Sequence, residues 1–71
     1  MTGIMHHKYD ERGTLRIWNT VRAITIWGHQ DGVVVVELHG IPVLRFDSAQ
    51  PQLDAGFLAN LIFQTDKEWA S

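Results

Sequence analysis

The segment that most constrains the fold is Gly32–Asp47, with the sequence GVVVVELHGIPVLRFD. Two runs rich in β-branched residues flank His39-Gly40, a two-residue sequence typical of tight β-hairpin turns. Pairing Leu38 with Ile41 across this turn places apolar residues on both faces of the hairpin, because side chains alternate along a strand. A sheet with one solvated face alternates apolar and polar residues, so we expect both faces of this hairpin to need cover.

Two shorter segments before the hairpin alternate in the manner of strands, Thr14–Trp18 and Val21–Gly28. The loop between the second of them and the hairpin can hold either four or three residues. A three-residue loop, with Gly32 in the left-handed conformation as a bulge, places Ile24 opposite Leu38. This register separates apolar from polar side chains better than the four-residue loop does, so we expect the shorter loop.

These registers divide the expected sheet into two faces. One face is apolar and is predicted to form the core; it holds Leu15, Ile17, Ile24, Ile26, Val34, Val36, Leu38, Ile41 and Val43. The second face is mixed and rich in aromatic residues; it holds Arg16, Trp18, Thr25, Trp27, Val33, Val35, Glu37, Leu44 and Phe46. The second face therefore carries the aromatic and charged residues that a buried core does not account for.

A helix is predicted after the hairpin. Asp47 and Ser48 end the last strand and supply capping side chains, and Pro51 suits the first turn of a helix. From Gln52 to about Phe63, leucine, phenylalanine and isoleucine recur at helical spacing. Gly56 costs about 1 kcal/mol in a helix interior, which predicts that the helix packs closely on the sheet at that point.

The predicted fold is α+β: an antiparallel β-meander of three to four strands followed by one C-terminal α-helix on the core face. Residues 1–13 are expected to form a flexible N-terminal arm, residues 14–65 a single small domain, and residues 66–71 a tail. One helix covers one face of a sheet. The second face is then either covered by the arm or by Trp69, or it stays open.

Several function classes find little support in the composition. The chain has 71 residues and no cysteine, which excludes disulfides and thiolate zinc sites. The four histidines fall on the arm and on turns at opposite ends of the sheet, so we expect no metal site. Ser48 is better used as a cap, no carboxylate pair is placed in an evident cleft, and the glycines are scattered at turns. We therefore expect no catalytic residues, no cofactor and no enzymatic activity.

The expected location and partners follow from similar considerations. No apolar run approaches the length of a membrane span and no signal-peptide core is present, so we expect a soluble, cytoplasmic protein without membrane contact. In size, acidity and lack of motifs the chain is similar to small phage-encoded inhibitors of bacterial defence and to antitoxins. No alignable residues carry that likeness, so no site follows from it.

The second face supplies the predicted partner-binding residues, because exposed aromatic and arginine side chains dominate interface energetics. They are Arg16, Trp18, Trp27, Val35, Leu44 and Phe46. The expected partner is a second copy of the chain, a larger protein that the chain inhibits or adapts, or both.

The alternative is single-stranded nucleic acid, with bases stacked on Trp18, Trp27 and Phe46. The net charge of −2 and the expected position of Arg45 on the opposite face weigh against it.

Overall fold

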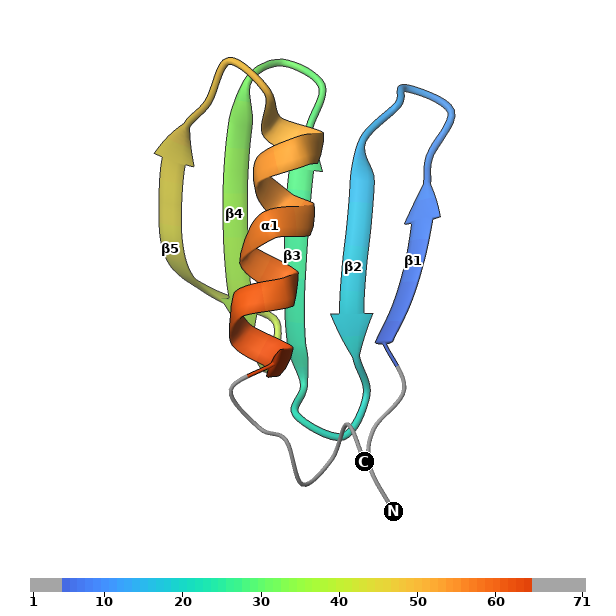
Figure 1. Cartoon of the computed structure of the whole chain (residues 1–71), viewed down its shortest axis with the longest axis vertical. Helices are drawn as coiled ribbons and strands as arrows, with labels where there is room; N and C mark the ends of the chain where they lie inside the picture. The colour runs from blue at the N-terminus through green and yellow to red at the C-terminus, as the bar shows by residue number, and fades with distance from the viewer. Residues whose placement is uncertain (1–4, 65–71) are drawn as a thin grey trace.

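The structure is a computed structural model and describes residues 5–64. One antiparallel sheet holds five strands in sequence order, and one helix packs on it (Figure 1). The elements are β1 (Met5–Tyr9), β2 (Leu15–Asn19), β3 (Ile24–His29), β4 (Val33–Leu38), β5 (Ile41–Asp47) and α1 (Pro51–Gln64). The α+β class and the helix packed on the sheet are confirmed, whereas the predicted strand count of three to four is too low. The predicted tail and Trp69 lie outside the described residues.

The additional strand is β1, which forms from residues assigned to the N-terminal arm. It pairs with β2 from Met5 opposite Asn19 to Tyr9 opposite Leu15. The β1 sequence, MHHKY, carries little apolar alternation, so its pairing is not evident from the sequence. The turn after β1 is held by Asp10, whose Oδ1 accepts hydrogen bonds from the backbone N–H groups of the residues two and four positions later.

The turn between β2 and β3 explains why β3 begins later than predicted, at Ile24 rather than at Val21. The side chain of Asn19 accepts hydrogen bonds from the backbone N–H groups of Val21 (2.9 Å) and Arg22 (3.0 Å). Such a bond fixes a turn in place of a strand. Ala23 completes the turn with a left-handed φ of +56°.

The predicted register between β3 and β4 is confirmed. Ile24 lies opposite Leu38, and His29 lies opposite Val33 at the end of a three-residue loop. Gly32 closes that loop with a φ of +101°, a conformation that glycine adopts without steric cost.

The β4–β5 hairpin has the predicted turn but not the predicted register. His39 and Gly40 have φ angles of +53° and +79°, as a tight two-residue turn of this hand requires. The register then shifts between Val36 and Glu37, a β-bulge that leaves Val43 without an opposite residue in β4.

The bulge reverses the facing of the rest of β5. Leu44 lies opposite Val36 and Phe46 lies opposite Val34, so both side chains share the core face. The prediction that Arg45 lies on the core side of the sheet, with Leu44 and Phe46 on the second face, is therefore wrong. A slip of one residue exchanges the two faces, because the side-chain period of a strand is two residues.

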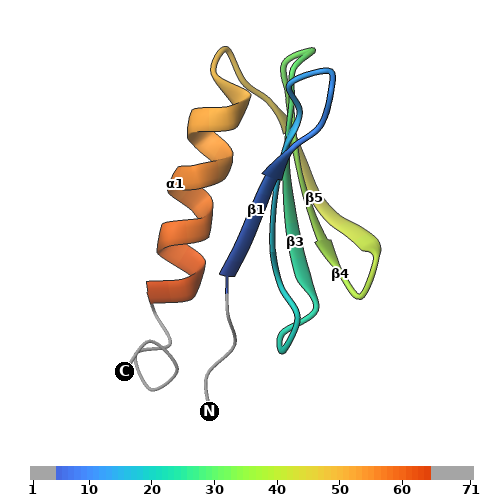
Figure 2. The same cartoon turned by 90° about the vertical axis from the view of Figure 1, so that its right-hand side faces the viewer.

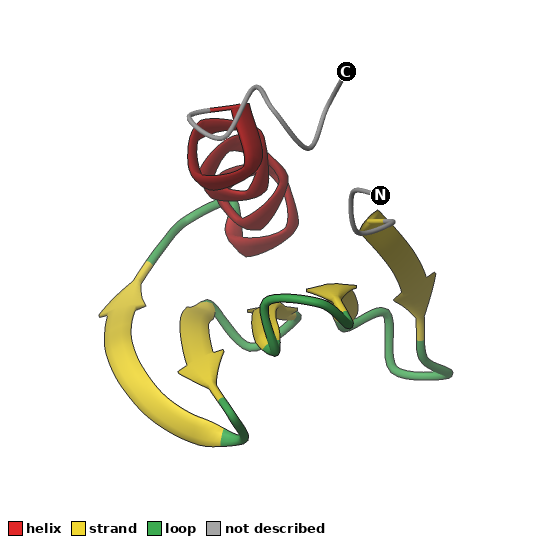
Figure 3. Ribbon diagram, turned by 90° about the horizontal axis from the view of Figure 1, so that it is seen from below, coloured by secondary structure: helices red, strands yellow, loops and turns green. Residues whose placement is uncertain are grey.

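The core lies between α1 and the middle of the sheet (Figures 2 and 3). Ile26 of β3 and Val34 of β4 are fully buried there. The buried core residues are Leu15, Ile17, Ile26, Val34, Val36, Ala55, Ala59 and Phe63, with Ile24, Phe46, Leu58 and Ile62 packed against them.

Close packing between helix and sheet occurs at Gly28 rather than at the predicted Gly56. A Cβ atom on Gly28 would lie 2.6 Å from the carbonyl oxygen of Pro51 and 2.9 Å from the Cα of Gln52. A Cβ on Gly56 would meet no atom within 4 Å. Gly28 therefore allows the first turn of α1 to sit directly on β3.

The predicted helix start is confirmed in its main features. The first helical hydrogen bond runs from the Asp54 N–H to the Gln50 carbonyl (2.9 Å), with Pro51 at the first helical position. The Ser48 hydroxyl oxygen accepts a hydrogen bond from the Gln50 N–H (3.0 Å), and the same hydroxyl donates to the Asp54 carboxylate. These bonds satisfy polar groups at the helix end and anchor α1 where β5 finishes.

Candidate interaction surfaces

The side of the sheet away from α1, which we call the back face, brings together four of the six predicted site residues. Arg16 lies directly opposite Trp27, and Trp27 lies opposite Val35. Trp18 occupies the same face two residues after Arg16 on β2. The predicted grouping of these four side chains is therefore present in the structure.

The two tryptophans of the back face have partners within the chain. The guanidinium carbon of Arg16 lies 4.3 Å from the ring centroid of Trp18 and 5.3 Å from that of Trp27. His6 stacks on Trp18 with ring centroids 5.3 Å apart, and His29 stacks on Trp27 at 5.8 Å. Both indole rings are half-buried as a result, since cation–π and stacking contacts cover their faces.

Leu44 and Phe46, the other two predicted site residues, do not lie on the back face. Phe46 packs against the core cluster beneath α1. Leu44 is 49% exposed, and it lies on the core face beside the exposed side chains of Leu38 and Ile41. The sequence placed both residues on the other face because it did not reveal the bulge.

The same bulge makes the back face more basic than predicted. Arg45 lies opposite Val35 on that face, and Lys8 of β1 lies opposite Arg16. The carboxylates of Glu37 and Asp47 share the face, and those of Asp10 and Asp31 border it at the loops. Three cationic side chains thus share the face with the two indole rings, in place of the single arginine that the expected register provided.

The outer side of α1 carries three of the large apolar side chains whose helical spacing predicted the helix. Leu53, Phe57 and Leu61 are 65%, 66% and 51% exposed. They recur every four residues and so form one row along the helix, which we call the α1 stripe. Between Pro51 and Gln64 the only charged residue is Asp54, and its carboxylate is hydrogen-bonded to Ser48.

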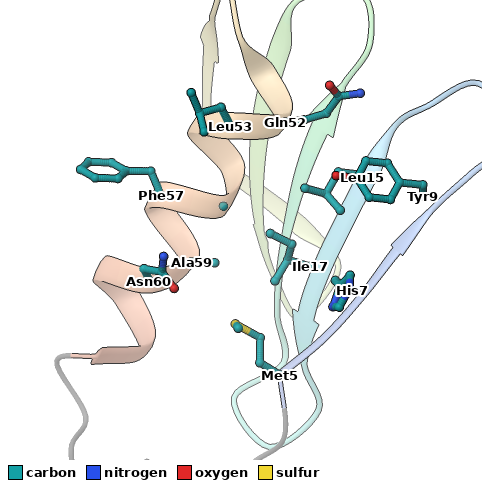
Figure 4. A pocket seen from close by; sticks show the side chains of 11 residues that line it. Met5, His7, Tyr9, Leu15, Ile17, Gln52, Leu53, Phe57, Ala59 and Asn60 are labelled. Carbon is teal, nitrogen blue, oxygen red and sulfur yellow. The ribbon is translucent and has the colours of Figure 1, made fainter.

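A groove of about 550 Å³ separates α1 from β1 (Figure 4). Apolar side chains of the sheet line its floor, and exposed Met5 and Tyr9 line its outer wall. The lining residues are Met5, His7, Tyr9, Leu15, Ile17, Gln52, Leu53, Gly56, Phe57, Ala59 and Asn60. None of these is Asp, Glu, Lys or Arg. Figure 4 shows Phe57 projecting from α1 on the side away from β1, so the groove and the α1 stripe adjoin each other along the helix.

The exposed apolar residues that sequence reasoning missed are Met5 and Tyr9 of β1, the three residues of the α1 stripe, and Leu38, Ile41 and Val43, which were expected in the core. The sequence did contain a signal for the stripe. Ala55 and Ala59 share a second row with four-residue spacing on the opposite side of the helix. Two apolar rows and almost no charge describe a helix that is apolar all round, and such a helix is normally covered on both sides.

A metal-binding cluster and a membrane-spanning helix are both absent from the described residues. No three His, Asp or Glu side chains between positions 5 and 64 gather closely enough to hold a metal ion. The same part of the chain contains no helix long and apolar enough to cross a membrane. Comparisons with protein-family models, with curated proteins and with solved structures each find no match to this chain.

Proposed function

We propose that the chain is a small, non-enzymatic protein-binding module whose binding surface is the α1 stripe. The observation that carries this proposal is the exposure of Leu53, Phe57 and Leu61 on a helix with one charged residue. Contiguous apolar patches on a monomer mark interaction sites, because burying them in an interface removes them from water. Each Å² of apolar surface so buried contributes about 25 cal/mol.

The α1 stripe supports this role better than the back face does. Trp18 and Trp27 already contact Arg16 within the chain, so a partner that binds the back face displaces existing contacts. Phe57 has two thirds of its surface exposed and offers a ring without that cost. The groove beside the stripe adds a concave apolar surface into which a side chain of the partner fits. Binding by such a surface acts by occlusion, as in an inhibitor or an adaptor.

Site-specific photo-cross-linking tests the location of the binding surface. A photoreactive amino acid is placed at Phe57, at Trp27 or at Val21, which is an exposed apolar position away from both surfaces. We expect a defined protein adduct from position 57 in cells that produce the chain, and none from the control at position 21. An adduct from position 27 with none from position 57 would contradict the proposal and favour the back face.

Single-stranded nucleic acid is the second candidate ligand, and one observation favours it. The bulge in β5 places Arg45 on the back face, with Lys8 and Arg16 near the two indole rings. Three phosphate contacts to a single strand give a log–log salt slope of about −2, since each contact releases counterions. Anisotropy of a labelled oligonucleotide across a salt series, with Arg45→Gln as the variant, measures this slope. Absent or salt-insensitive binding would eliminate this candidate.

A further inference from the structure

We infer that the partner of the α1 stripe is a second copy of this chain, bound in a two-fold dimer with antiparallel α1 helices. This inference rests on the proposed function, because it takes the α1 stripe as the binding surface. It adds the identity of the partner and the geometry of the contact.

The first support is the symmetry of the stripe. Leu53 and Leu61 lie four residues before and four residues after Phe57. A two-fold axis beside Phe57 therefore places Leu53 of one copy against the partner subunit's Leu61, and the two phenylalanines against each other. Two-fold interfaces use the same patch on both subunits, and in this arrangement every side chain of the stripe meets an apolar side chain of the other copy. Because of the rise of a helix, the stripe is about 12 Å long. The antiparallel arrangement brings the whole length of both stripes into contact.

The second support is the charge distribution. A two-fold contact places the charges near its axis against their own copies, and like charges that meet in this way are unfavourable. The α1 stripe has no such penalty, because its neighbour Asp54 lies in the first turn and is bonded to Ser48. The back face, in contrast, carries charged side chains of both signs, and a contact there has to remove them from water. The stripe is thus the surface of this chain best suited to meet itself.

The third support is the size of the chain. A domain of about 60 residues buries only about 60% of the surface that its unfolded chain exposes, which leaves it marginally stable alone. Small scaffolds compensate with disulfides, a metal or oligomerisation. This chain has no cysteine, and its described residues hold no metal cluster. A dimer through α1 adds an apolar layer outside the helix, so that both sides of α1 become covered.

Solution mass across a dilution series tests the dimer. Sedimentation equilibrium of the full chain is expected to give twice 8.1 kDa at high concentration. Phe57→Gln is expected to weaken dimerisation at least about 30-fold, the effect of losing 2 kcal/mol at an interface hot spot. Ile41→Gln is the matched control, because Ile41 is as exposed as Leu53 (65%) but lies on the β4–β5 hairpin. Dissociation by Ile41→Gln with none by Phe57→Gln would overturn the inference.

Cysteine cross-linking tests the antiparallel geometry, and the absence of native cysteine makes single substitutions clean. Oxidation of a mixture of Leu53→Cys and Leu61→Cys chains is expected to link position 53 to position 61. Either variant alone is expected to link poorly, because its two cysteines stand about 12 Å apart along the helix axis, beyond disulfide reach. Efficient linking of each variant to itself, with none between the two, would overturn the antiparallel arrangement.

The failure of this inference is distinguishable from the failure of the proposed function. A chain that stays monomeric at every concentration overturns the dimer. If position 57 then forms a photo-adduct with a different protein, the protein-binding function stands and only the identity of the partner changes. If position 57 forms no adduct at all, both proposals fall.

Discussion

The two sides of α1 differ in a way that reverses the usual expectation for a helix on a sheet. On the inner side the small residues Ala55 and Ala59 are almost fully buried, and the one large buried side chain, Phe63, comes only at the last turn. The outer side carries Leu53 and Phe57, each about two thirds exposed. The contact at Gly28 brings the helix so close to β3 that little volume remains between them. The buried side of a helix is thus set by how much space the sheet leaves, and not by hydrophobicity alone.

The difference between the two sides of α1 is tested most strongly by truncating one phenylalanine on each side. Phe63 is buried in the core cluster (8% exposed), whereas Phe57 is 66% exposed. We expect Phe63→Ala to lower the free energy of unfolding by about 3–5 kcal/mol, because it removes buried surface and leaves a cavity. Phe57→Ala should change it by less than about 0.5 kcal/mol in the monomer. Urea denaturation at a concentration where the chain is monomeric measures both values.

Equal losses from the two variants would contradict the assignment of the sides, since they would mean that Phe57 is packed within the monomer. A variant that still unfolds cooperatively is required for the comparison. If Phe63→Ala does not fold, Phe63→Leu provides a smaller truncation at the same site.

A substitution at Gly28 is expected to have the next largest effect. The added methyl group of Gly28→Ala would meet the Pro51 carbonyl and force the first turn of α1 away from β3. We expect a loss of about 1–3 kcal/mol, the usual cost of overpacking a well-packed contact. Thermal unfolding followed by circular dichroism measures the change, and an unchanged midpoint would show that the helix does not lie this close to the sheet.

The same substitution at Gly56 is expected to act in the opposite direction. A Cβ at this position meets no atom of the chain, and alanine favours the helix over glycine by about 1 kcal/mol. Gly56→Ala should therefore raise the free energy of unfolding by up to about that amount. Destabilisation of the monomer would show that an unrecognised contact fills the space beside Gly56.

The smallest expected effect concerns the back face, where the aromatic residues are covered by their own neighbours. Arg16→Gln removes the cation that lies over both indole rings. We expect a loss of about 0.5–1 kcal/mol, as for cation–π contacts at exposed sites, together with a shift in tryptophan emission. Unchanged emission would indicate that Arg16 does not cover the rings in solution, and the back face would then be the more open of the two surfaces.

Local sequence signals predicted the parts of the fold that local geometry controls. The His39-Gly40 turn and the three-residue loop ending at Gly32 both depend on residues with positive φ. The apolar pattern then determined the register between β3 and β4, because a slip would have exposed the whole apolar set. The capping role of Ser48 follows from chemistry within a few residues of the helix start.

The parts that the sequence did not reveal depend on contacts between distant segments. The bulge at Val43 has no glycine, and Pro42 beside it is as typical of an edge strand as of a bulge, so Leu44 and Phe46 were assigned to the wrong face. Strand β1 is held by its pairing with β2 rather than by its own composition. The periodicity of residues 52–63 predicted that a helix forms there. Which of its two apolar rows faces the sheet depended on Gly28, which lies in β3.

The order of the strands in the sheet has a consequence for the way the chain folds. Every strand pairs with its neighbour in the sequence, so each hairpin forms from a short loop and at low entropic cost. The helix follows all five strands, and it must reach back to β2 and β3 to seal the core. The strands are therefore synthesised before the helix that covers their apolar face, and that face stays uncovered until α1 packs on it. Until α1 packs, the uncovered apolar face is a site of aggregation and of capture by chaperones.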